Sequence, residues 1–148
     1  MKLITSESTM SFLTYAGSIP FWFCALLLII GIEPQNAGID IQYLLSVYGL
    51  VISSFMAGTL WGQQVNKNNG WQRYLLFCSN GIALGLWVAF LTLSFTSLMI
   101  AYVVAFLVLL LIDYQLSQSG ISNKVYFKLR LRVTFIVVLA IGVSALAG

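Results

Sequence analysis

Residues 74–116 read YLLFCSNGIALGLWVAFLTLSFTSLMIAYVVAFLVLLLIDYQL, and this stretch decides the class of fold. As one helix it would run about 64 Å, which is roughly twice the thickness of the hydrocarbon core of a bilayer. The polar segment 94–97 (SFTS) divides it into two runs of about 20 residues, and each run is long enough to cross a membrane. We therefore predict a tight hairpin of two transmembrane helices, 74–94 and 96–116.

Three further apolar runs of the same length lie on either side of this hairpin. They occupy residues 11–31, 41–63 and 130–147, and polar, turn-forming segments separate them: EPQNAG at 33–38, NKNNG at 66–70 and SQSGISNK at 117–124. The sequence therefore predicts an all-α fold, in which residues 1–148 form a single polytopic bundle of five transmembrane helices.

The composition supports lipid as the solvent of this chain. Of 148 residues, 60% are hydrophobic and 7% are charged, whereas soluble domains carry about 25% charged residues. The chain contains no histidine, and its two cysteines lie inside apolar runs, so we predict no metal and no cofactor. The net charge of +3 is too small and too scattered to predict a nucleic-acid partner.

The distribution of positive charge predicts the orientation. Five spans place the N-terminal tail, the second loop and the fourth loop on one side, with Glu33 and Asp40 on the other. That first side holds all seven basic residues: Lys2, Lys67, Arg73, Lys124, Lys128, Arg130 and Arg132. Loops rich in Lys and Arg stay in the cytoplasm, which predicts N-in and C-out. We expect the first run to be a retained helix, because a signal peptide would need more positive charge than Lys2 and a cleavage site.

Small residues recur every four positions in two of the spans. The stripes are Ser54, Gly58 and Gly62 in the second span, and Gly81, Gly85 and Ala89 in the third. Because close helix contact in lipid relies on small residues, we expect Gly58 and Gly81 to face each other within the bundle. The alternative is that these stripes form an interface with a partner or a second copy.

Pro20 lies within the first span, next to Gly17 and Ser18. It lacks the amide hydrogen that would bond to the carbonyl of Ala16, so we predict a kink. The kink either sets the shape of the bundle, which we favour, or opens a cavity.

Polar residues inside the spans are the candidates for a site. Asp113 is the acidic residue within a predicted span, and Arg130 and Arg132 open the fifth span at the same membrane level. We expect an anchor in which Asp113 pairs with one arginine, at modest benefit to stability, while the cations contact lipid headgroups. The alternative is a proton or anion path. For Asn80 we expect a hydrogen bond between helices, with the lining of a headgroup or quinone pocket as the alternative.

Four segments carry a resemblance to a known family. They are residues 15–21 (YAGSIPF), residues 48–62 (YGLVISSFMAGTLWG), residues 129–134 (LRLRVT) and Trp87. Together they resemble the small multi-spanning family of transmembrane protein 69, over roughly residues 12–145. That resemblance implies the topology but no chemistry. Leu60 stands where the family usually has histidine, and the third span lacks the usual proline, so this chain lacks any site built on that histidine.

These observations favour a membrane subunit over an enzyme. No acid–base pair or nucleophile motif is visible, so we predict no enzymatic activity. The leading hypothesis is an accessory, assembly or stabilising subunit that binds a membrane-protein partner or a second copy, with lipids around it. The alternative is a small transporter or a lipid- or quinone-binding protein. We expect the inner (cytoplasmic) membrane, or the mitochondrial inner membrane in a eukaryote.

Site-directed labelling tests the predicted topology. Single cysteines at Asn68 and Ser122 should react with a membrane-impermeant reagent only from the cytoplasmic side, and cysteines at Asn36 and Gly148 only from the other. Reaction of positions 68 and 148 from the same side would contradict the five-span topology.

Overall fold

The computed structural model describes residues 2–31, 38, 40–64, 70, 72–120 and 122–148. Asn36 and Asn68, two of the positions chosen for labelling, lie outside the described residues. All regular secondary structure in the described part of the chain is α-helix. The helices are α1 (Lys2–Ala16), α2 (Ile19–Ile30), α3 (Ile41–Gln64), α4 (Gln72–Thr92), α5 (Phe95–Gln118) and α6 (Lys124–Ala147).

Among the described residues, five helical segments are long and apolar enough to cross a membrane, as predicted. The first, Ser8–Ile30, combines most of α1 with α2, and α3, α4, α5 and α6 supply the others. The predicted hairpin is confirmed, since α4 ends at Thr92 and α5 begins at Phe95. The sequence predicts that the last span starts at residue 130. Helix α6 begins six residues earlier, where the side chain of Asn123 accepts a hydrogen bond from the Val125 amide.

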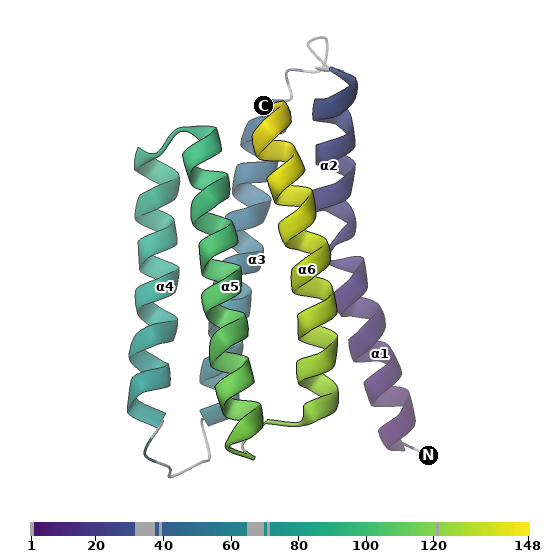
Figure 1. The fold of residues 1–148 in the computed structure, drawn as a ribbon, viewed down its shortest axis with the longest axis vertical. Helices are drawn as coiled ribbons and strands as arrows, with labels where there is room; N and C mark the ends of the chain where they lie inside the picture. Colours follow the sequence, from purple (N-terminus) through teal and green to yellow (C-terminus); the bar gives the residue numbers. More distant parts are fainter. Residues whose placement is uncertain (1, 32–37, 39, 65–69, 71, 121) are drawn as a thin grey trace.

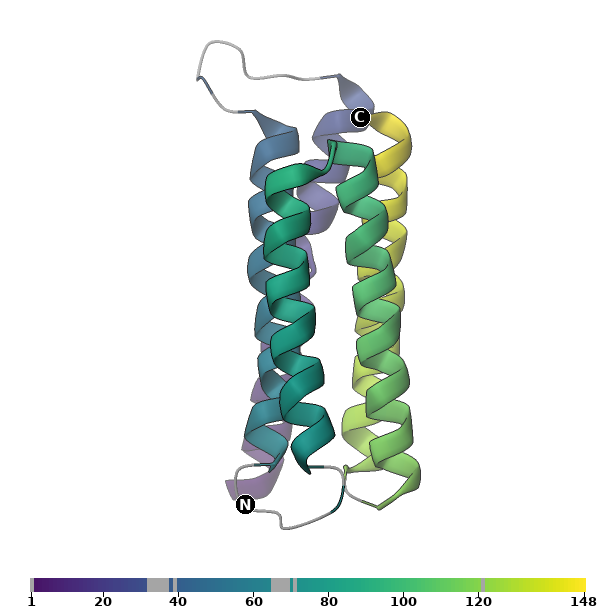
Figure 2. The same ribbon diagram turned by 90° about the vertical axis from the view of Figure 1, so that its left-hand side faces the viewer.

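The spans form an approximate ring around a shared core (Figures 1 and 2). Going round it, α4 packs against α3, α3 against α2, α2 against α6 and α6 against α5, while α5 also contacts α3 and α4. The N-terminal end of α1 lies at the same end of the bundle as the α5–α6 connection, and the C-terminus lies at the opposite end. An odd number of spans places the two ends of the chain at opposite ends of the bundle. Helix α1 packs most closely on α6 and leans away from the remaining helices.

The predicted kink is a break between α1 and α2 at Gly17 and Ser18. Pro20 follows as the second residue of α2, where its missing amide hydrogen costs no helical bond. The hydroxyl of Tyr48 on α3 donates to the carbonyl oxygen of Gly17 at 2.8 Å. This bond satisfies a backbone acceptor at the break and ties it to the bundle.

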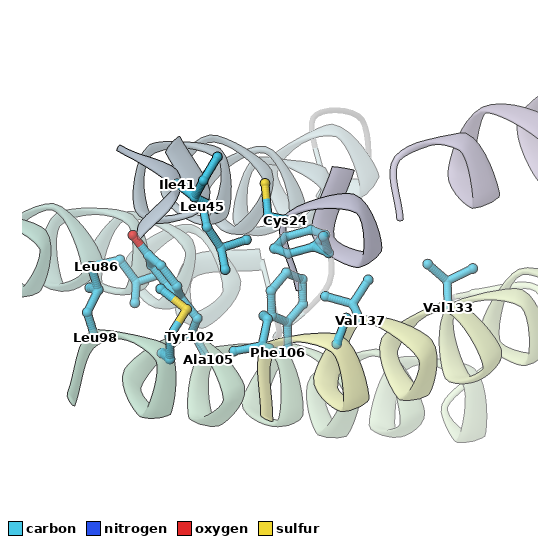
Figure 3. Close-up of a cluster of buried hydrophobic side chains, with 14 residues drawn as sticks. Cys24, Ile41, Leu45, Leu86, Leu98, Tyr102, Ala105, Phe106, Val133 and Val137 are labelled. Atoms are coloured by element: carbon cyan, nitrogen blue, oxygen red, sulfur yellow. The ribbon is translucent and has the colours of Figure 1, made fainter. Parts of the chain in front are cut away.

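The larger hydrophobic cluster in the described part of the chain contains buried side chains from α2, α3, α4, α5 and α6 (Figure 3). Phe21, Leu45, Tyr102, Phe106 and Val137 are among its buried members. A smaller cluster between α3, α4 and α5 contains Ala57, Leu60, Leu75, Leu109 and Leu116. Met56 packs against both clusters, so α3 connects the two halves of the core.

Tyr102 on α5 packs closely against α3 in the larger cluster. Its side chain is fully buried, and its hydroxyl donates to the carbonyl oxygen of Ser46 at 2.7 Å. Its ring lies over Gly49 on α3, where an added Cβ would come within 2.6 Å of the ring carbon Cε2. Gly49 is therefore a glycine that close packing requires, and it belongs to neither of the predicted small-residue stripes.

The expected contact between Gly58 and Gly81 within the bundle is wrong. Both residues are exposed, as are Gly62 and Gly85, and an added Cβ at any of these four positions would meet nothing within 4 Å. Ala57 and Ser79 instead form the contact between α3 and α4, through a 2.7 Å hydrogen bond from the Ser79 hydroxyl to the Ala57 carbonyl oxygen. The rotation of each helix decides this outcome, because each residue moves a side chain about 100° around the helix axis.

Gly49→Ala should lower the free energy of unfolding by about 1–3 kcal/mol, because the new methyl group overpacks a rigid ring in a filled core. Gly58→Ala is the matched control on the same helix, and it should not destabilise the protein. Unfolding of both variants in detergent micelles by a denaturing surfactant measures the difference. Equal stability of the two variants would contradict the role assigned to Gly49.

Candidate functional site

A buried ion pair joins α5 to α6. The Nε–H of Arg130 donates to Oδ2 of Asp113 at 2.8 Å, and the two side chains are 3% and 0% exposed. Asp113 lies about 8 Å from the end of α5, and Arg130 about 9 Å from the start of α6, at a rise of ~1.5 Å per residue. The predicted pairing of Asp113 with an arginine is thus present, but inside the bundle rather than at its edge.

Arg132 has no part in this pair. It is exposed, because two residues along a helix turn a side chain by about 200° and place it on the opposite face. Of the two arginines expected near Asp113, Arg130 therefore forms the pair and Arg132 does not. Arg130 lies in the second turn of α6 and points into the bundle, while Arg132 and Lys128 remain on the surface.

The guanidinium of Arg130 also reaches α3, where its Nη1 contacts Sδ of Met56. Because Met56 packs against both hydrophobic clusters, the ion pair sits where α3, α5 and α6 meet. Removing water from two charges is costly, and the cost is recovered only if they remain close together with good geometry. The pair consequently restricts how α5 and α6 can slide or rotate against each other.

Asn80 does not join two helices, contrary to expectation. It is exposed on α4, and its amide nitrogen donates to the Leu76 carbonyl oxygen of the same helix at 3.2 Å. Its neighbour Ser79 is buried and makes the bond between helices described above. Both residues were visible as polar positions in the third span, and only the rotation of α4 distinguishes their roles.

A cleft of about 300 Å³ lies between α1, α3 and α6, next to the ion pair. Leu13 and Phe55 line it and are themselves 63% and 68% exposed, so the cleft reaches the surface between α1 and α3. The break at Gly17 contributes to its wall, which supports the alternative in which the kink accompanies a cavity. The lining residues are Met10, Leu13, Thr14, Gly17, Ile52, Phe55, Met56, Thr59, Phe106, Tyr126, Leu129, Arg130, Val133, Thr134 and Val137.

The cleft is polar towards one end and apolar towards the other. Tyr126 and Arg130 lie on the part of its α6 wall nearest the helix start, and Val137 lies about 16 Å from Tyr126 along the axis. The hydroxyls of Thr14 and Thr59 donate to carbonyl oxygens of their own helices. Arg130 is the one charged residue among these lining residues, and its guanidinium carries five N–H bonds.

A second hollow of about 340 Å³, at the opposite end, is a weaker candidate. It is lined by Asp40, Gln42, Tyr43 and Ser46 together with apolar residues of α4 and α5. Its polar groups stabilise the local fold: Asp40 accepts from the Tyr43 amide, Ser46 donates to the Gln42 carbonyl oxygen, and Gln42 donates to that of Gly148. These bonds cap α3 and hold the end of α6.

The described residues thus define a polytopic helical bundle with a buried ion pair beside a mainly apolar cleft. They include no group of three or more His, Cys, Asp or Glu residues that could hold a metal ion. Over residues 6–146 the chain matches the model of a family described as "Protein of unknown function (DUF3429)", and the chain belongs to that family. No curated protein and no solved structure matches the chain.

Separating the ion pair should be strongly destabilising. Asp113→Asn and Arg130→Gln should each lower the free energy of unfolding by about 3–5 kcal/mol, because each leaves a buried polar or charged group without its partner. Arg132→Gln is the matched control and should change it by no more than about 0.5 kcal/mol, because its side chain is exposed. Surfactant-induced unfolding measures all three, and an Asp113→Asn protein as stable as the Arg132→Gln protein would contradict this role.

Proposed function

We propose that this protein binds a membrane amphiphile, a lipid or an isoprenoid quinone, in the cleft between α1, α3 and α6. The single observation that carries the proposal is that Arg130, which is paired with Asp113, lines an otherwise largely apolar cleft. Ligand pockets typically combine apolar walls with a few polar groups that orient the ligand, and have volumes of about 300–1,000 Å³. The observed 300 Å³ lies at the lower limit of that range.

The bilayer itself supplies a reason for occupancy. An empty apolar cleft leaves its lining atoms without dispersion contacts on one side. Because the cleft reaches the surface between α1 and α3, a hydrocarbon chain can enter sideways from the lipid. The polar end of the cleft would then receive the head of the ligand, near Arg130 and Tyr126, and Val137 would contact its tail.

We also propose an orientation and a location. The described basic residues outside α1 are Arg73, Lys124, Lys128, Arg130 and Arg132, which all lie towards the same end of the bundle. The positive-inside rule supports a cytoplasmic position for this end, hence N-in and C-out in the inner membrane. The resemblance to the family of transmembrane protein 69 supports the mitochondrial inner membrane in a eukaryote.

An accessory subunit is the second candidate, and α4 is the observation that favours it. Asn80, Gly81 and Gly85 are exposed on this helix, which is the least buried of the five spans. A carboxamide and small residues on an outer face suit contact with another membrane helix. The same surface serves a protein partner or a second copy of the chain.

Purification in a mild detergent followed by native mass spectrometry tests both candidates. We expect an amphiphile of one mass to accompany the wild-type protein in stoichiometric amount and to be lost from Leu13→Trp, whose indole occupies the cleft. Phe12→Trp is the matched control, because residue 12 is adjacent on α1, is 72% exposed and does not line the cleft.

Equal loss of the amphiphile from both variants, or none bound to the wild type, would contradict binding in the cleft. Stoichiometric foreign subunits that dissociate on Gly81→Leu but not on Leu13→Trp would favour the accessory role instead. Leu13→Trp and Phe12→Trp are compared in the same detergent under conditions in which both variants are equally stable, so that partial unfolding is not mistaken for loss of ligand.

A further inference from the structure

We propose that the cleft selects amphiphiles whose head is uncharged and carries a carbonyl oxygen, and that it discriminates against anionic phospholipids. This inference rests on the proposed binding of an amphiphile and specifies the chemical class of that ligand. It follows from the charge, the hydrogen bonding and the size of the site beside Arg130.

The charge of Arg130 is already balanced. Its Nε lies 2.8 Å from Oδ2 of Asp113, and both side chains are buried, so the pair has no net charge. A phosphate placed next to the pair would add a negative charge beside the Asp113 carboxylate in a mainly apolar cleft, which screens charge poorly. Lys128 and Arg132 are exposed on α6 and are suited to anionic headgroups at the surface, outside the cleft.

The hydrogen bonding requires an acceptor on the ligand. A guanidinium carries five N–H donors and no acceptor. The contacts with Asp113 and with Met56 involve Nε and Nη1, so they do not exhaust these donors. A carbonyl oxygen accepts such a bond without bringing a charge, whereas an ammonium or another donor-rich head would oppose the guanidinium.

The size of the cleft favours a ligand with a single hydrocarbon chain. The apolar α6 wall from Arg130 to Val137 is about 10 Å long, and the cleft volume is about 300 Å³. This space suits a single chain or a ring with a short chain. Two natural sources share the required chemistry, namely the ring carbonyl of an isoprenoid quinone and the ester carbonyl of a neutral glycerolipid.

Three probes with the same chain length test the selection on the purified full-length protein in a non-ionic detergent. Monodecanoylglycerol and its phosphate ester have the same chain and the same ester carbonyl, and differ only by the phosphate. A decyl-substituted benzoquinone represents the quinone source. Binding is measured from the rise in unfolding temperature with probe concentration, because a ligand that binds only the folded state stabilises it.

For the wild type we expect the uncharged glycerol ester or the quinone to bind about tenfold more tightly than the phosphate ester, or better. The tighter of the two uncharged probes identifies the source. Asp113→Asn should reverse the order, because it leaves Arg130 with an unbalanced positive charge that a phosphate neutralises. The double variant Asp113→Leu/Arg130→Met should fold, since an apolar pair can replace a buried ion pair, and should bind both esters within about twofold.

Tighter binding of the phosphate ester to the wild type, with loss of that binding in Leu13→Trp, would overturn the selection and leave amphiphile binding intact. Probes that bind wild type and Leu13→Trp equally would overturn both proposals. If Asp113→Asn fails to fold, the double variant decides. Loss of discrimination in it supports the role of the ion pair, and unchanged preference for the uncharged ester contradicts it.

Discussion

A guanidinium inside a bundle of this kind is tolerable only beside a carboxylate, and the Asp113–Arg130 pair therefore constrains the rest of the structure. The pair lies about 8–9 Å inside the helix ends, and both of its side chains are almost fully buried. Because the 2.8 Å bond allows little movement, it fixes the register and rotation of α5 against α6. The contact of Arg130 with Met56 extends this constraint to α3 and to both parts of the core.

The break in the first span complements this constraint. Helix α2 packs against α3 and α6, but α1 leans away on the N-terminal side of Gly17, whose carbonyl oxygen accepts a hydrogen bond from Tyr48. The space left between α1, α3 and α6 is the cleft, and the ion pair forms part of its wall. The ion pair, which restricts helix movement, is thus adjacent to the cleft. The same arginine that orders three helices lies where a ligand would need a hydrogen-bond donor, which is why a structural role and a binding role do not exclude each other.

The sequence predicted the positions of the spans better than it predicted which residues of each helix point into the bundle. The five spans and the hairpin at residues 92–95 follow from length and hydrophobicity, which act along the chain. The expected contact between Gly58 and Gly81 and the expected interhelical bond of Asn80 were wrong because both depend on helix rotation. In a soluble helix the apolar face reveals that rotation, but a helix surrounded by lipid is apolar all round. One clue was available: Tyr102 lies within an apolar span, and a buried tyrosine hydroxyl needs a partner.

The sequence by itself determined that this chain is a membrane bundle of helices, because every backbone amide in hydrocarbon must be bonded within its own helix and about 20 apolar residues then suffice to cross. It also brought Asp113 and Arg130 to one level, since the short connection between residues 118 and 124 makes α5 and α6 neighbours. Only the tertiary structure decided that Arg130 rather than Arg132 turns inward, and that a cleft opens beside it. Those outcomes depend on the rotation of α6 and the lean of α1, which several helices set together through packing and no single segment encodes.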